Sequence, residues 1–524
     1  MSKDQLPPTP PKLPDLPPKI SDFDLDDMLH RRPEKPVPTT TPAPTAVQQP
    51  VIPVDLTLAE RELEHLDILT KIQSRLTTQG YIGELSNKVK VYLIGLSKDG
   101  PRDARIHLLL IGPPGVGKSA LLGILRRYFE PNIKLPLSER TVLDWHRMTA
   151  ASPDHLGEVI NNLDGKILII SQLEGMADSQ YSLMVVMDPE ETGLNLLTVK
   201  GTSEENTLEE ISLNGIPTLV STTTWVKLDP QITRRADGIN PDESPEQTAQ
   251  IKLHKAQRWG SKEYKKQIKT ADMVLKTIPL YLKQYSEYEI LIPFATAVIE
   301  YIPNVLLARS DVDKIFSYTS QITKLHIKKR LILHDENENT IISSPADNYY
   351  TWFLCKDSFE RRLADLRDTR AFKVLKCLRE SITPDVRSVS LAGTSDNPGF
   401  MHTLRQKGIL YALNTVHQAL EELEDKGYVV SERDSRDKRH NLYTLTDRAM
   451  IPLNIRFPMP EVESAYINYV TNHFCEQTEA GNTKFRDARD YQIFKNSFRV
   501  FEVSTGVEIT QQVISQQTLR MWLQ

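Results

Sequence analysis

The stretch that decides the fold is residues 107–122, HLLLIGPPGVGKSALL. A mostly apolar run leads into GPPGVGKS at residues 112–119, which has the spacing G-x-x-x-x-G-K-[ST], and a helical pattern follows it. This order of strand, loop and helix brings backbone N–H groups together around one anion. The glycines permit a tight wrap that side chains would block. The sequence therefore predicts a phosphate-binding loop; the competing interpretation is a chance Gly/Pro turn before a helix.

The loop and the first helical residues form the predicted nucleotide site. Lys118 is expected to bridge the β- and γ-phosphates, and Ser119 is expected to ligate Mg²⁺. The predicted cofactors are therefore ATP and Mg²⁺. The predicted nucleotide-binding residues are Gly112, Pro113, Pro114, Gly115, Val116, Gly117, Lys118, Ser119 and Ala120.

Hydrolysis also needs a second strand that ends in an acid for Mg²⁺ and a carboxylate that activates water. The next apolar run, KILII, is followed by Ser171 and Gln172 instead. Ser171 could hold a metal-bound water, Gln172 could orient a water, and Glu174 lies two residues past the expected base. A rival match puts Asp188 after LMVVM, a run that reads equally well as a helix. The first assignment is favoured, and it predicts slow turnover.

Composition bounds the remaining possibilities. The chain has 524 residues, a net charge of -5 and three cysteines without C-x-x-C spacing. This excludes a disulfide framework or a zinc ribbon and favours a reducing, intracellular setting. No apolar run is long enough for a membrane span and no signal peptide opens the chain, so a cytoplasmic, nucleoid-associated protein is expected. Any DNA binding must come from local patches, because the chain as a whole is not basic.

Proline marks the first boundary. Fourteen of the 34 prolines lie in the first 53 residues, which predicts an extended, disordered tail. Within it, ISDFDLDDMLHRR at residues 20–32 could form a short helix with one apolar side. Two interpretations stay open: an acidic spacer, or a motif that folds on contact with a partner.

Strand-like and helical runs alternate as far as Gly260, which predicts an α/β domain with a parallel sheet. A single helix is expected near residues 56–76, and residues 270–333 are expected to be helical throughout. The segment from Ile451 onward carries no readable motif.

Residues 365–450 have helix-turn-helix spacing followed by two strands around DSRDKRHN. This resembles a winged helix of the kind found in MarR-like regulators and at the C-terminus of origin-initiator proteins. Asn414 is the expected N-cap of the third helix and Gly427 is expected to end it. A protein-docking module is the alternative to DNA binding. The predicted DNA contacts are Thr415, His417 and Gln418 in the major groove and Arg436, Lys438 and Arg439 on the wing.

Three stretches follow the order found in the minichromosome-maintenance (MCM) ATPases, hexameric AAA+ DNA helicases. They are HLLLIGPPGVGKSALL, KILIISQLEGMADSQYSLMVVMDPEETGLNLLTVKG and IPTLVSTTTWVKLDPQITRRAD. The resemblance covers residues 80–335 and, more loosely, the winged helix. It implies a P-loop AAA+ domain with a helical lid, in which Ser171–Gly175 takes the place of the motif Asp-Glu-hydrophobe-Asp-Lys.

The resemblance also assigns roles outside the loop. Thr223 or Thr224 falls where the family has a sensor Asn, Arg235 resembles the arginine finger, and Arg309 resembles the second sensor. LNLLTVKG and EEISLNG resemble the two arms of a channel hairpin. Lys200 near its tip could meet a DNA phosphate, although a solvated lysine is the commoner situation.

The departures limit this resemblance. The two acids and the sensor Asn are replaced, and the residues before 80 are too few for the family's N-terminal OB-fold domain. The resemblance therefore implies a ring-forming helicase or helicase-related ATPase with weak hydrolysis, acting on DNA in replication. The alternative is a non-hydrolysing, ATP-switched initiator or a DNA-binding regulator or scaffold. The expected partners are DNA, further copies or a catalytic homologue in a mixed ring, and a replication partner of the tail.

Five domains are expected on this basis. They are a disordered tail (1–55), an AAA+ α/β nucleotide-binding domain (56–265), a helical lid (266–340), a winged helix (350–450) and a C-terminal region of unknown role (451–524).

Overall fold

The computed structural model groups Val54–Gln524 into one compact unit, separate from Met1–Pro53. It describes residues 55–518 with internal gaps, so the predicted disordered tail lies outside the described residues. The gaps are 131–138, 145–161, 174–186, 189–192, 201–206, 225–229, 243, 303–307, 336–337, 365, 367–368, 384–385, 393–398, 435–440, 451–457 and 478–482.

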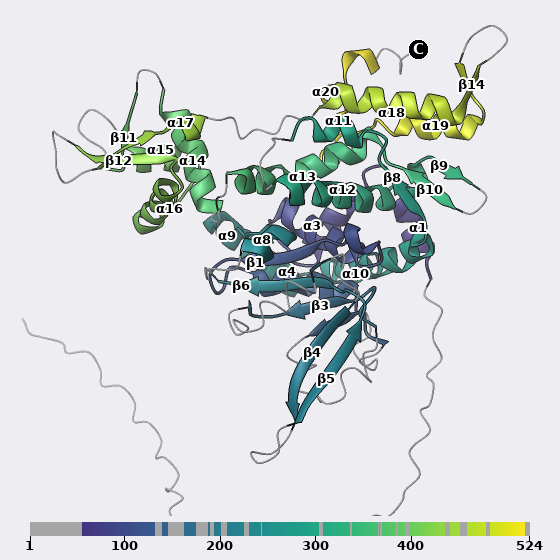
Figure 1. Ribbon diagram of the computed structural model, residues 1–524, viewed down its shortest axis with the longest axis horizontal. Helices are drawn as coiled ribbons and strands as arrows, with labels where there is room; N and C mark the ends of the chain where they lie inside the picture. The colour runs from purple at the N-terminus through teal and green to yellow at the C-terminus, as the bar shows by residue number, and fades with distance from the viewer. Residues whose placement is uncertain are drawn as a thin grey trace, which may run out of the picture. The chain divides into compact units, whose positions relative to one another are not determined.

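A five-stranded sheet organises the first half of the unit, with the order β2-β3-β6-β1-β7 (Figure 1). All neighbouring strands in it are parallel, as predicted, so their carboxyl ends share one edge. This mixed α/β arrangement is consistent with a P-loop AAA+ fold. The strands are β1 (His107–Ile111), β2 (Val142–Asp144), β3 (Ile167–Ile170), β6 (Thr218–Thr223) and β7 (Ala236–Ile239).

A helix that is buried over most of its length packs on the sheet. α3 (Leu85–Ser97) is buried from Lys88 to Ser97 and packs against β1 and β6 and against several helices, among them α2, which is described below. Lys90 Nζ lies 2.6 Å from Asp237 Oδ2, and Tyr318 donates a hydrogen bond of 2.7 Å to the same oxygen. The other helices packed on α3 are α4 (Lys118–Tyr128), α12 (Ala308–Leu325) and α13 (Pro345–Leu363).

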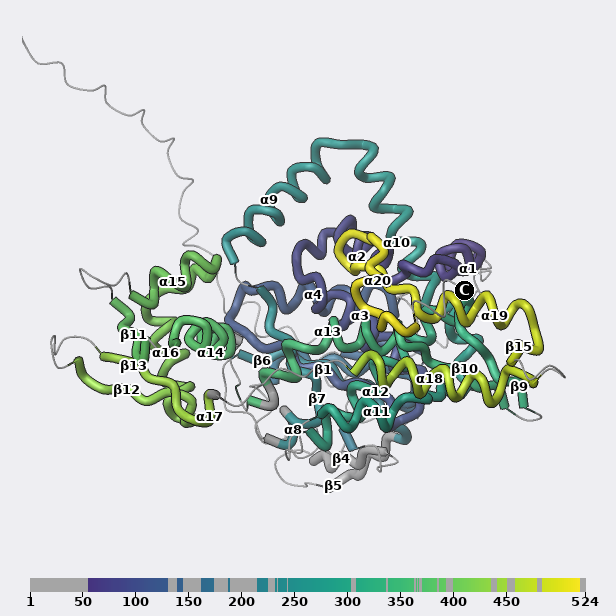
Figure 2. The backbone as a smooth tube through the Cα atoms, turned by 90° about the horizontal axis from the view of Figure 1, so that it is seen from above, coloured from purple at the N-terminus to yellow at the C-terminus, as the bar shows by residue number. Residues whose placement is uncertain are grey.

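The amino-terminal segment forms two helices where one was predicted. α1 (Thr57–Leu63) and α2 (Ile68–Thr78) are separated by a break at residues 64–67, and both pack on α10 (Lys262–Leu282). The apolar spacing is continuous across the break, so periodicity alone could not reveal it. α9 (Pro245–Gly260) precedes α10, and the two form an arch in Figure 2.

The expectation of continuous helix over residues 270–333 is wrong. A three-stranded sheet has the order β8-β10-β9; its strand β8 separates α10 from α11 (Ala295–Ile299), and β9 follows α12. Apolar runs as short as those in these strands cannot be separated from helix by periodicity. The strands are β8 (Glu289–Leu291), β9 (Ile332–His334) and β10 (Asn339–Ile342).

Residues 364–449 have a hydrophobic core of their own. Helices α14 (Thr369–Ser381), α15 (Phe400–Gln406) and α16 (Leu413–Asp425) pack on a sheet with the order β11-β13-β12. The strands are β11 (Val389–Ser390), β12 (Val429–Arg433) and β13 (Asn441–Leu445).

Of the two predicted ends of α16, the C-terminal one is confirmed and the N-terminal one is wrong. Gly427 ends the helix with φ +69°, and its N–H donates to the Glu424 carbonyl at 2.8 Å, as a C-terminal glycine does. The predicted Asn414 cap is wrong, because the helix already begins at Leu413 and Ala412 occupies the N-cap position.

The C-terminal segment returns to the first core. α18 (Met459–Phe474) packs against α11 and α13, and Tyr466 donates a hydrogen bond of 2.8 Å to Ser497. The Phe501 N–H donates to the Tyr350 hydroxyl at 2.8 Å. The chain closes with β14 (Cys475–Gln477), β15 (Thr483–Phe485), α19 (Ala488–Asn496) and α20 (Thr510–Val513). The 364–449 core is thus inserted between two helices of the larger one.

A buried histidine makes the sheet sensitive to acid. The Leu219 N–H donates to His107 Nδ1 at 3.0 Å, and burial lowers the pKa of His107 from 6.5 to about 3. Because the unfolded chain takes up this proton first as pH falls, the contribution to stability is complete above pH 6.5 and is lost toward pH 3.

From pH 7 to pH 5 this group should lower the free energy of unfolding by about 2 kcal/mol. The variant His107→Gln keeps an acceptor for Leu219 but does not titrate, so its stability should fall less over the same range. Urea unfolding followed by circular dichroism measures both proteins. An equal fall would contradict this role.

Candidate nucleotide site

The glycine-rich loop closes around its own lysine. Gly115 and Gly117 have φ of +84° and +104°, a conformation that L side chains rarely adopt. A Cβ on either would meet nothing within 4 Å, so backbone conformation rather than crowding requires glycine. Lys118 Nζ donates to the carbonyls of Gly112 and Pro113, the latter at 2.9 Å. The predicted strand, loop and helix are therefore all present.

Helix α4 begins directly at the loop. Its eleven residues start at Lys118, and Ser119 and Ala120 in its first turn are exposed. The N-terminus of a helix this long is a favourable place for an anion because its first N–H groups point outward along the axis. The predicted phosphate ligands thus lie on one accessible surface.

A cavity of about 340 Å³ opens beside the loop. Apolar groups on it come from Ile82 and Ile251, and Tyr81 adds a ring. A space of this size with a few polar groups suits a base and its sugar. It is also lined by Pro113, Pro114, Gly115, Val116, Gly117 and Ala120, so base and phosphate positions are contiguous.

One polar atom at the cavity lacks a partner. Gln247 is 8% exposed, and its Oε1 is buried without a hydrogen bond among the described residues. Its Nε2 donates to Glu84 Oε1 at 3.3 Å. A buried acceptor without a donor is costly, and Gln247 lines the cavity, so a turn of its amide toward the amino group of a bound base would satisfy it. Sequence reasoning missed Gln247 because a lone glutamine near a helix start carries no spacing signal.

Two buried ionisable groups shape the wall of this cavity. Lys88 Nζ donates to Thr77 Oγ1 at 2.6 Å and to the Tyr81 carbonyl at 3.1 Å, and burial lowers the pKa of Lys88 to about 8. Glu84 accepts from the Asp242 N–H and from Asn87, and burial raises its pKa. These contacts tie the Tyr81 turn and the start of α9 to α3.

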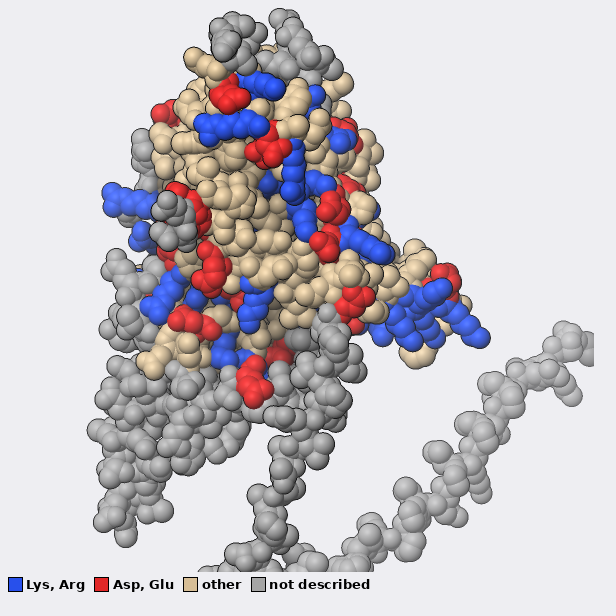
Figure 3. All heavy atoms as spheres, turned by 90° about the vertical axis from the view of Figure 1, so that its right-hand side faces the viewer, with Lys and Arg blue, Asp and Glu red and all other residues tan. Residues whose placement is uncertain are grey.

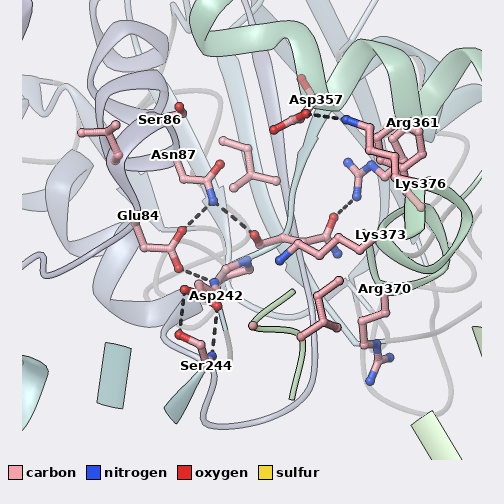
Figure 4. Close-up of a pocket in the computed structure, with 18 of the residues that line it drawn as sticks. Glu84, Ser86, Asn87, Asp242, Ser244, Asp357, Arg361, Arg370, Lys373 and Lys376 are labelled. Carbon is pink, nitrogen blue, oxygen red and sulfur yellow. Dashed lines mark hydrogen bonds and ion pairs between the residues drawn. The ribbon is translucent and has the colours of Figure 1, made fainter. Parts of the chain in front are cut away.

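A second cavity, of about 710 Å³, shares Glu84 and Asp242 with the first. Its other side carries Arg361 of α13 and Lys376 of α14 (Figure 4). Arg361 donates to Asn240 Oδ1, and Lys376 lies 3.0 Å from Asp357 Oδ1. The two cavities therefore have a common wall, and the second one reaches the inserted 364–449 core.

The residues directly after β3 are Ser171 and Gln172, a hydroxyl and an amide, rather than acids. Ser171 Oγ accepts from Arg126 at 3.3 Å, and Arg126 also pairs with Asp144 at 2.9 Å. Asp144 ends β2 next to β3, and no sequence motif pointed to it. Gln172 is exposed, and Glu174 lies outside the described residues. The structure describes this edge of the sheet only as far as Leu173, so the predicted departure from a two-acid site stays a prediction.

Thr223 is brought to the loop and is buried. It ends β6 opposite Ile111, and its carbonyl accepts from the Gly112 N–H at 3.2 Å. Its hydroxyl donates to the Thr224 carbonyl at 2.9 Å. Of the predicted sensor residues, this one lies beside the loop.

The predicted arginine finger, Arg235, and the predicted second sensor, Arg309, lie away from the glycine-rich loop. Arg235 ends α8 (Pro230–Arg235) just before β7, and the pairing of Ala236 with His107 places it at the edge where the strands begin. It forms an ion pair of 2.7 Å with Asp188, so the rival metal acid is held away from Ser119. Arg309, exposed in the first turn of α12, is on the same side, because Lys314 donates to the Arg234 carbonyl.

The predicted DNA contacts are only partly described. His417 and Gln418 are exposed on α16, whereas Thr415 is half-buried and lines the 710 Å³ cavity. Arg436, Lys438 and Arg439 lie outside the described residues. Lys200 ends β4 (Gly193–Lys200), which pairs with β5 (Thr207–Asn214) as a hairpin, and its side chain is not described.

No family model and no curated protein matches the chain. Among solved structures it is similar to a full-length MCM homolog from Methanopyrus kandleri, at 15% identity and a TM-score of 0.34, over 56% of this chain and 61% of that one. It is similar to a putative ATPase from Cytophaga hutchinsonii at 13% identity and 0.30, over 56% and 88%. A Drosophila ORC structure bound to DNA matches at 12% identity and 0.21, over 83% and 96%.

These similarities assign no family. The chain spans less than two thirds of the M. kandleri chain. Among the described residues, no cluster of three metal-binding side chains occurs, and no helix is long and apolar enough to cross a membrane.

Lys118→Ala should abolish detectable binding of a fluorescent ATP analogue, because a charge-assisted contact to the phosphates is lost. Its melting temperature should stay near the wild-type value, since the hydrogen bonds from Lys118 to Gly112 and Pro113 lie within a surface loop. Lys484→Ala, at an exposed lysine of β15, is the control and should bind normally. Tight binding by Lys118→Ala would refute the assignment.

Gln247→Leu should weaken ATP binding by roughly tenfold, because the unpaired acceptor proposed for the base is removed from the cavity wall. The same analogue titration measures it. Gln250→Leu, at an exposed residue one turn further along α9, is the matched control. Unchanged affinity in Gln247→Leu would place the base elsewhere.

Proposed function

We propose that this chain is an ATP-binding, MCM-like AAA+ protein that acts on DNA in replication, with weak hydrolysis. The observation that carries the proposal is the contiguous site made by the glycine-rich loop, the N-terminus of α4 and the 340 Å³ cavity with its buried Gln247 acceptor. The amino group of a purine base, such as that of adenine, is a donor of the kind that this acceptor lacks.

Magnesium would be held mainly by the nucleotide. Ser119 fits as one protein ligand, and Ser171 could hold a water, but the described end of β3 adds no carboxylate. Bound Mg²⁺ supplies neutralisation of phosphate charge. The chain's own residues then position the triphosphate: Lys118 contacts it, and Gln172 could orient a water without taking its proton.

A shared site between subunits explains the distant arginines. Arg235 and Arg309 lie at the edge of the sheet opposite the loop, so they cannot reach a nucleotide held by their own chain. A second copy, or a catalytic homologue in a mixed ring, would bring its loop to them, as arginine fingers require. In such a ring the pair between Arg235 and Asp188 would have to open.

The inserted 364–449 core is proposed to be a winged helix that contacts DNA through His417 and Gln418. The proposed domains are the AAA+ domain, the helical lid, this winged helix and the region from 451 onward. The N-terminal tail is proposed to bind a replication partner, and the protein to reside in the cytoplasm with the nucleoid.

One observation favours the alternative, a non-hydrolysing ATP switch that controls assembly or DNA binding. Glu84 and Asp242 form a wall common to the nucleotide cavity and to the cavity that Thr415 of α16 lines. A nucleotide in the first cavity could therefore alter the environment of the proposed DNA-reading helix without being hydrolysed.

The double variant Ser171→Asp, Gln172→Glu should hydrolyse ATP at least about tenfold faster than the wild type, since it adds a metal ligand and a general base. Phosphate release measures this. Asp188→Asn is the comparison and should not abolish the slow wild-type rate, because Asp188 pairs with Arg235 and is not placed as a metal ligand. A fast wild-type rate that Asp188→Asn abolishes would show that the acids were placed on the wrong strand.

A further inference from the structure

The hairpin formed by α9 and α10 carries an excess of positive charge. Residues 250–270 hold seven Lys or Arg and one acid, although the whole chain carries a net charge of -5. They form the end of α9, the start of α10 and the single residue between them, Ser261, which caps α10 by accepting from the Tyr264 N–H at 3.1 Å. The seven cations are Lys252, Lys255, Arg258, Lys262, Lys265, Lys266 and Lys269.

This hairpin is attached at its base and exposed beyond it. His254 packs on Tyr264, with ring centroids 5.4 Å apart, and its Nε2 lies 3.3 Å from the Thr78 carbonyl. Residues 255–260, further out, are all exposed. The arch stands clear of the other elements in Figure 2, and blue side chains gather on the corresponding projection at the right-hand edge of Figure 3.

The cations are not used to hold the fold together. No ion pair joins any of the seven to an acidic side chain within the described part of the chain. Lys276, by contrast, lies two turns nearer the base and pairs with Asp272 at 2.8 Å. Like charges on one projection repel one another, and this repulsion is not offset by ion pairs within the hairpin. A bound polyanion would reduce the repulsion.

An exposed aromatic side chain lies at the tip. Trp259 is 84% exposed, and Lys265 Nζ lies 5.9 Å from the centre of its ring. An exposed indole next to cations matches the surface on which unpaired bases stack while nearby cations bind the phosphates. A duplex keeps its bases stacked inside and would leave the ring unused.

We propose that the tip of the α9–α10 hairpin binds single-stranded nucleic acid, with Trp259 stacking on a base and Lys262 and Lys266 binding phosphates. The two lysines are one helical turn apart and therefore share a face of α10. The inference deepens and rests on the proposed DNA-directed function. It also places a nucleic-acid contact on α9, because Trp259 belongs to this helix. The first turns of α9, including Gln247 and Ile251, line the nucleotide cavity.

The test uses the full chain and a fluorescent oligothymidylate of about 25 nucleotides, with anisotropy measured at several salt concentrations. Lys262→Gln, Lys266→Gln should lower the affinity about tenfold and reduce the salt slope by about 1.4, the value for two lost phosphate contacts on a single strand. Trp259→Ala should lower the affinity at least fivefold with little change of slope, an estimate of about one stacked base.

Lys484→Gln, Arg489→Gln removes the same charge from exposed positions in the C-terminal region and should bind as the wild type does. Hairpin variants that match this control overturn the inference. The inference is also overturned if the hairpin variants lose self-association, measured by light scattering, but keep the wild-type affinity for the oligonucleotide. The hairpin would then be a contact between copies of the chain. If the wild type binds neither single-stranded nor duplex DNA, the DNA-directed function itself fails; if it binds and the hairpin variants bind equally, only the hairpin inference fails.

Discussion

The hydrogen bond from the Gly112 N–H to the Thr223 carbonyl joins the loop to the sheet, and the rest of the site depends on it. It fixes where β1 ends, so the positive φ angles at Gly115 and Gly117 turn the chain back onto the N-terminus of α4. Lys118 then donates to the carbonyls of Gly112 and Pro113, within the loop that is proposed to bind the phosphates. Without this junction, the cavity beside it would be an ordinary surface hollow.

Hydrogen bonds of Glu84 connect the surroundings of this junction to other elements of the unit. Glu84 has φ +51° and accepts hydrogen bonds from α9 and from Asn87, so it links α3, the cavity and the start of the hairpin. The same carboxylate faces the cavity toward the inserted core. A ligand that completes the Gln247 contact would therefore act on a wall that other elements share, which is the physical basis for a switch.

Strongly patterned parts of the sequence predicted the structure well. The loop motif, the parallel sheet, the three helices and last two strands of the 364–449 core, and the helix end at Gly427 agree with the prediction, whereas the short strand β11 was not predicted. The predictions failed where a short apolar run decides between strand and helix, as at Glu289–Leu291, and where a cap residue is shifted, as at Asn414. Gln247, Asp144 and the wall around Glu84 could not be foreseen, because their roles arise from contacts between residues far apart in the chain.

The most direct measurement of the central claim is isothermal titration calorimetry of the full chain with ATP and with GTP in the presence of Mg²⁺. The account predicts saturable heat for ATP, about one nucleotide per chain. The GTP titration measures base preference, since adenine and guanine each carry an amino group that could donate to Gln247 Oε1. Absence of heat with both nucleotides, together with no rise in melting temperature, would contradict it.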